Sequence, residues 1–68
     1  MKTELIKGQM YVTSTGYTLE YVNTLNGISY FKNILKQFTS LVANNYGLIP
    51  FQKEVAETFI PQPNEVRL

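Results

Sequence analysis

Residues 30–44 read YFKNILKQFTSLVAN, and their spacing decides the fold that this sequence predicts. At about 100° per residue, the large apolar side chains of this stretch fall within an arc of roughly 140°. Lys, Asn, Gln, Ser and Thr fill the opposite side, which is typical of an amphipathic helix with one buried stripe. The stripe consists of Tyr30, Phe31, Ile34, Leu35, Phe38, Leu41 and Val42. We therefore predict a helix over about residues 29–44.

The residues that precede this stretch allow a second interpretation. The pair NG at 26–27 is a strong signal for a two-residue β-hairpin turn. A third strand would then cover residues 28–32, with Val22 facing Phe31. In the helical interpretation the same pair is a loop, and Ser29 is a candidate N-cap. We favour the helix because its pattern extends over many more residues.

Upstream, the chain carries the signals of a β-hairpin. Residues 10–13 (MYVT) and 17–22 (YTLEYV) are rich in aromatic and β-branched residues, and a small, turn-forming segment separates them. Because side chains alternate along a strand, Tyr17, Leu19 and Tyr21 share one face. We expect that face to pack on the helix.

Downstream, residues 50–59 predict a second, shorter helix. Pro50 suits the first turn of a helix, and Phe51, Val55 and Phe59 follow at a spacing of four. Residues 61–68 contain two prolines, and two interpretations stay open for them: a flexible tail, or an added edge strand through Val66 and Leu68. The sequence thus predicts a single α+β domain over residues 1–68, with the hairpin packed on the long helix and closed by the short one.

Composition limits how so small a domain can be stabilised. The chain has 68 residues, no Cys and no His, so a disulfide is excluded and a structural zinc site has essentially no ligands. Hydrophobic residues make up 44% of the sequence and aromatic residues 13%. This is enough for a good core, for self-association, or for both.

The sequence offers little for catalysis, and we predict a protein that is not an enzyme. General acid–base chemistry draws mainly on His or on carboxylates with shifted pKa values, and neither His nor Asp is present. Glu54 and Glu57 are neighbours on the predicted short helix, where a solvated face explains them best. The glycines are scattered singly, so there is no phosphate-binding loop. We expect no cofactor and no metal.

The charge and hydropathy patterns also limit location and partners. No apolar run approaches the roughly 18 residues of a membrane span, and the N-terminus lacks the apolar core of a secretion signal. We therefore expect a cytoplasmic protein that does not contact membrane. Six basic and five acidic residues give a net charge of +1, which is little for binding nucleic acid.

Several short motifs resemble small uncharacterised bacteriophage accessory proteins of SH3-like barrel type. They are KGQMYV at 7–12, EYV at 20–22, NG at 26–27, YF at 30–31 and FIP at 59–61. The resemblance implies a small all-β barrel in place of the α+β fold, and the helical stripe after residue 30 departs from it. It also implies an inhibitor-like accessory protein that binds a host or defence factor in the host cytoplasm.

The excess of aromatic residues favours a binding function. Tyrosine is enriched at protein interfaces because it combines a large apolar body with one polar tip. We expect a non-catalytic protein-binding module. A homodimer, in which the partner is a second copy of the chain, is one form of this expectation. The expected contact residues are Tyr11, Tyr17, Tyr21 and Tyr46. The alternatives are weak binding of single-stranded nucleic acid and a purely structural assembly subunit.

Overall fold

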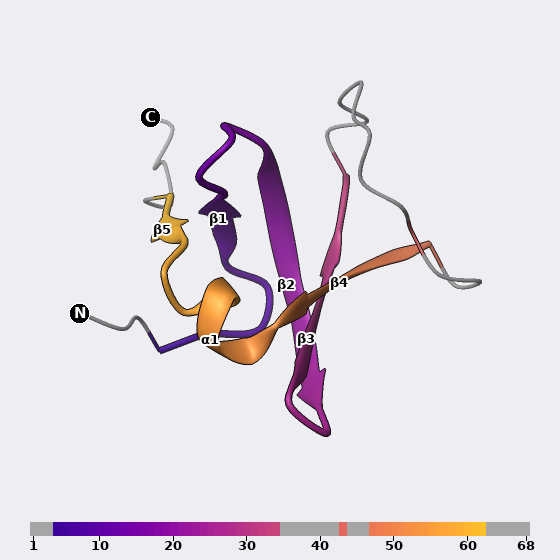
Figure 1. Cartoon of the computed structure of the whole chain (residues 1–68). Coiled ribbons are helices and arrows are strands. Elements are labelled where there is room, and N and C mark those ends of the chain that lie inside the picture. The colour runs from indigo at the N-terminus through magenta and orange to yellow at the C-terminus, as the bar shows by residue number, and fades with distance from the viewer. Residues whose placement is uncertain (1–3, 35–42, 44–46, 63–68) are drawn as a thin grey trace.

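The computed structural model describes residues 4–34, 43 and 47–62, and Figure 1 shows the whole chain. The described residues form five strands and one short helix. In chain order they are β1 (Met10–Val12), β2 (Thr18–Leu25), β3 (Ile28–Lys32), β4 (Leu48–Gln52), α1 (Lys53–Ala56) and β5 (Ile60–Pro61).

The strands form one antiparallel sheet in the order β4-β3-β2-β1-β5. The first four strands are a meander, in which each strand pairs with the one before it. After β4, the chain passes through α1 and returns to the far edge, where β5 pairs with β1 (Figure 1). The fold is therefore mostly antiparallel sheet, as in the all-β alternative, and differs from a hairpin packed on two helices.

The N-terminal hairpin is confirmed. Met10 pairs with Glu20, Tyr11 with Leu19 and Val12 with Thr18. Its turn closes with a hydrogen bond from the N–H of Thr13 to the carbonyl oxygen of Tyr17 (2.8 Å).

The long helix over 29–44 is wrong in its first part, because Ile28–Lys32 is strand β3 and pairs on both sides. The local cause is the NG turn. Asn26 and Gly27 both have positive φ, 53° and 80°, as a type I′ turn requires, and this turn directs the chain back along β2. Residues 35–42 and 44–46, the rest of the predicted helix, lie outside the described part of the chain.

The register of this second hairpin also differs from the one expected from the sequence. The pairing shifts between Tyr21 and Asn23, so Phe31 faces Tyr21 and not Val22. The extra residue is a β-bulge, which bends and twists the strand that carries it. It brings Tyr21 and Thr24 onto the same, inner face of β2, where the Tyr21 hydroxyl lies 2.6 Å from Thr24 Oγ1.

The second helix is shorter than predicted and begins later. Pro50 and Phe51 belong to β4, and helix α1 covers Lys53–Ala56 alone. Pairing with β3, which is distant in sequence, keeps the first part of this segment extended. Val55, expected on the buried stripe, is 47% exposed.

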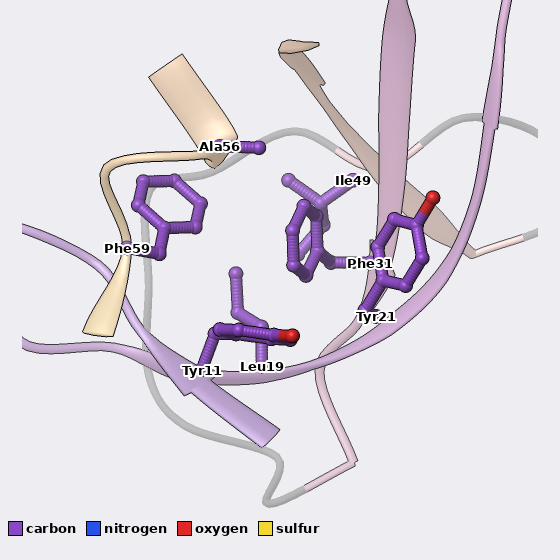
Figure 2. Close-up of a cluster of buried hydrophobic side chains, with 7 residues drawn as sticks. All are labelled: Tyr11, Leu19, Tyr21, Phe31, Ile49, Ala56 and Phe59. Atoms are coloured by element: carbon purple, nitrogen blue, oxygen red, sulfur yellow. The ribbon is translucent and has the colours of Figure 1, made fainter. Parts of the chain in front are cut away.

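Aromatic side chains from β1, β2 and β3 and from the residue before β5 fill the core (Figure 2), and Phe51 of β4 packs against them. Phe31 is at its centre: its ring centroid lies 5.5 Å from that of Tyr21, 5.5 Å from that of Phe59 and 5.6 Å from that of Phe51. Most of these pairs meet edge to face, the favourable geometry for aromatic rings. Buried Ala56 brings α1 close to the cluster. The buried apolar residues are Tyr11, Leu19, Tyr21, Phe31, Ile49, Ala56 and Phe59.

Hydrogen bonds fix both ends of the described chain to β1. The Tyr11 hydroxyl accepts a bond from the N–H of Ile6 (2.9 Å) and donates to the carbonyl oxygen of Glu4 (3.1 Å). At the other end, the N–H of Gln62 donates to the carbonyl oxygen of Met10 (2.8 Å), and the Gln9 side chain donates to the carbonyl oxygen of Gln62. The first two residues of the expected tail, Pro61 and Gln62, therefore belong to the fold. Residues 63–68 lie outside the described part.

Candidate functional site

The candidate site is the outer face of β2, β3 and β4, opposite the aromatic core. Residues paired directly across an antiparallel ladder share a face, and residues two apart on one strand do so too. Tyr30 pairs with Asn23 on one side and with Pro50 on the other. The next row towards the NG turn pairs Leu25 with Ile28. We call these five residues the Tyr30 surface: Asn23, Leu25, Ile28, Tyr30 and Pro50.

The Tyr30 surface is apolar and accessible. Leu25 is 59% exposed and Pro50 is exposed, whereas Asn23, Ile28 and Tyr30 are half-buried. The residues on either side of Tyr30 in β3, Ser29 and Phe31, have no exposed surface. The alternation along β3 therefore separates a core face from a face that is partly exposed.

The charges near the Tyr30 surface are balanced. Lys32 follows on the same face and pairs across the ladder with Glu20. Among the described residues there are three Lys and four Glu: Lys7, Lys32, Lys53, Glu4, Glu20, Glu54 and Glu57. The described part of the chain thus carries no excess of positive charge.

The structure separates the four tyrosines that were expected to contact a partner. Tyr11 and Tyr21 are 1% and 7% exposed, and both pack in the aromatic core. Tyr17 is half-buried and lies against that core from its edge. Tyr46 lies outside the described residues. Tyr11 and Tyr21 stabilise the fold, and neither offers its ring to a partner.

The helical pattern of residues 30–44 predicts Tyr30 on a buried stripe together with Phe31. In a strand these two neighbours point to opposite faces, and the structure places Phe31 in the core and Tyr30 outside it. The signal that could have identified Tyr30 was the NG turn. A hairpin at this turn places residues 28–32 in a strand. In a strand the side chain of Tyr30 points to the face opposite that of Phe31.

The described residues contain few groups arranged for chemistry. Within ranges 4–34 and 47–62, and at residue 43, no three His, Cys, Asp or Glu side chains gather as a metal site would require. The buried hydroxyls of Tyr21, Thr24 and Ser29 form a chain, with 2.7 Å between the last two oxygens. Thr24 bonds to both of the other hydroxyls, and the described contacts bring no acid or base to them.

One ion pair lies on α1, away from the Tyr30 surface. Lys53 Nζ is 2.6 Å from Glu57 Oε2. The hydrogen bond to Glu57, and then its negative charge, raise the pKa of Lys53 above its ordinary value. Both groups are satisfied by this contact, so the pair is a feature of the helix surface.

Comparisons with protein-family models, with curated proteins and with solved structures give no match for this chain. Within the part of the chain that the structure describes, no helix has the length and apolar character needed to span a membrane.

Proposed function

We propose that this chain is a non-catalytic protein-binding module that holds its partner on the Tyr30 surface. The observation that supports this is the placement of Tyr30 between Asn23 and Pro50 on the outer face, with exposed Leu25 in the next row. A tyrosine ring surrounded by apolar and amide side chains suits a polypeptide partner, because tyrosines at interfaces combine apolar contact with a hydrogen bond from the hydroxyl.

The narrower expectation is an accessory protein of bacteriophage that binds and modulates a host or defence factor in the host cytoplasm. It derives from the resemblance of the short motifs, and it stays a prediction. In this narrower proposal, the side chains of the Tyr30 surface are the ones that would contact such a factor.

The proposal is tested with the chain immobilised and host extract passed over it. A retained protein is then purified and titrated against wild-type chain and two variants, Tyr30→Ala and Leu25→Ser. Loss of an anchoring aromatic residue at an interface typically costs about 2 kcal/mol or more, which is roughly thirtyfold in Kd. Val55→Ala is the matched control, because Val55 is also apolar and exposed but lies on α1. Unchanged affinity in Tyr30→Ala and Leu25→Ser, with the fold retained, would refute the proposal.

A second candidate function, weak binding of single-stranded nucleic acid, is favoured by one feature of the same surface. Tyr30 has Lys32 two residues away on the same face and Asn23 beside it, so a stacked base would have a cation and an amide nearby. Balanced charge across the described residues argues against it, because phosphate contacts supply most of the affinity for nucleic acid.

A salt titration separates the two candidates. Binding of a fluorescent oligothymidine would weaken steeply as salt rises and would also weaken in Lys32→Gln. Binding of a protein partner through Tyr30 and Leu25 would respond to Tyr30→Ala but would change little with salt.

A further inference from the structure

A backbone feature shared by both edge strands leads to an inference about self-association. Edge strands expose unpaired N–H and C=O groups and can pair with another chain. In the described part of the chain, β4 pairs with β3 alone and β5 pairs with β1 alone. Each of these two strands contains a proline, Pro50 in β4 and Pro61 in β5.

The hydrogen bonds at the end of β4 show which way the nitrogen of Pro50 points. The N–H of Lys53 donates to the carbonyl oxygen of Gly27 (2.9 Å), one position beyond the pair of Ile28 with Gln52. Successive N–H groups of a strand point to alternate sides. The N–H of Phe51 therefore points towards β3, as that of Lys53 does. The nitrogen of Pro50, one residue before Phe51, points away from the sheet.

The same reasoning applies to β5. The N–H of Gln62 donates to the carbonyl oxygen of Met10 (2.8 Å), next to the pair of Tyr11 with Pro61. The nitrogen of Pro61, one residue earlier, therefore points away from β1. At both edges the proline occupies a position where any other residue would offer an outward N–H to an added strand.

We propose that Pro50 and Pro61 prevent a second copy of this chain from pairing with either edge of the sheet. A strand added beside β4 would meet no N–H donor at Pro50, two residues before the outward N–H of Gln52, and would meet the pyrrolidine ring in its place. Beside β5, a strand of two residues, Pro61 removes the donor in the same way. Neither proline breaks a bond within the sheet, because both nitrogens face outward.

This inference is independent of the proposed function. It concerns the backbone nitrogens at the two edges of the sheet, whereas the Tyr30 surface consists of side chains on its outer face. Pro50 belongs to both, because its ring lies on that face. It also bears on the third function considered from the sequence, a structural assembly subunit, because it excludes assembly through strand pairing at these two edges.

The test is the mass of the full chain in solution, measured by size-exclusion chromatography with light scattering over a range of concentrations. The variants are Pro50→Ala and Pro61→Ala, which restore an outward N–H while adding no apolar side chain. The matched control is Gln52→Val, which adds an apolar, β-branched side chain at another outward position of β4 without adding a donor. Circular dichroism verifies that each variant is folded. The two edges are tested with separate variants, so that if one variant does not fold, the other still tests its own edge.

We expect the mass of a folded proline variant to rise with concentration towards that of a dimer or larger species, while wild type and Gln52→Val stay unchanged. A folded variant with the same mass as wild type at every concentration would overturn the inference for that edge. If the wild type itself assembles, hydrogen exchange at the Gln52 amide shows whether the edge of β4 takes part, because this N–H points away from β3. Protection of that amide on assembly overturns the proposal for β4, and unchanged exchange supports it.

Discussion

Thr24 Oγ1 lies 2.7 Å from Ser29 Oγ, across the ladder that joins β2 to β3 and on the inner face of the sheet. Thr24 also lies 2.6 Å from the Tyr21 hydroxyl, so that three hydroxyls satisfy one another where water does not reach Ser29. The bulge at Val22 makes this possible, because it restores Thr24 to the inner face. A polar chain of this kind fixes the register of β2 against β3.

Ser29→Ala removes the last member of this chain. We expect a loss of about 1–2 kcal/mol in the free energy of unfolding, because Thr24 loses a partner in a buried site. Denaturant unfolding measures it, and Ser14→Ala, in the exposed first turn, is the control that should change stability little. Equal stabilities of the two variants would mean that the hydroxyl of Ser29 contributes nothing.

Tyr11→Phe separates the ring of Tyr11 from its hydroxyl. The ring contacts with Tyr21 and Phe31 remain, but the hydroxyl that binds the main chain of Glu4 and Ile6 is lost. We expect a destabilisation of about 1 kcal/mol and faster hydrogen exchange at the Ile6 amide, which loses its acceptor. Tyr17→Phe is the control, and exchange at Ile6 that stays slow in Tyr11→Phe would contradict the assignment.

Gly27→Ala tests the turn that sets β3 as a strand. Gly27 has φ of 80°, and a Cβ built there would contact nothing within 4 Å, so the penalty is conformational and not steric crowding. We expect a loss of about 1–2 kcal/mol, the usual cost of a left-handed conformation for an L-residue. A synthetic chain with D-alanine at this position is the matched control. It adds the same methyl group but favours positive φ, and should be at least as stable as wild type.

The ion pair on α1 predicts a pH dependence. Because Glu57 raises the pKa of Lys53, the contribution of the pair is fully present below the ordinary Lys pKa of 10.5 and is lost as pH rises through the higher folded value. Glu57→Gln should lower the pKa of Lys53 towards its ordinary value, as followed by the NMR titration of its side chain. Glu54→Gln, one of the weaker contributors, should lower it less. The effect on stability should be small, because the pair is exposed to solvent.

Local signals in the sequence identified part of this fold. The first hairpin and the inward face of Leu19 and Tyr21 followed from alternation and from a small turn segment, and both are confirmed. The NG turn was recognised but ranked below a helical stripe. The spacing of apolar residues alone could not choose between helix and strand over residues 28–32. Tyr30 and Phe31 fit one face of a helix, and they fit equally well the two opposite faces of a strand.

The sequence by itself determined the turns, the first hairpin, and the absence of disulfide and histidine chemistry, because each depends on residue type or on neighbours along the chain. Tertiary structure decided between the helix and the strand that the sequence left open over residues 28–32. It alone decided that β4 precedes a helix of one turn and that Tyr30 lies outside while Tyr11 lies inside. The physical reason is that β-pairing joins residues far apart in sequence. The face of the sheet that is covered is the one against which Ala56 of α1 and Phe59 pack, and both reach it only after β4 has paired with β3.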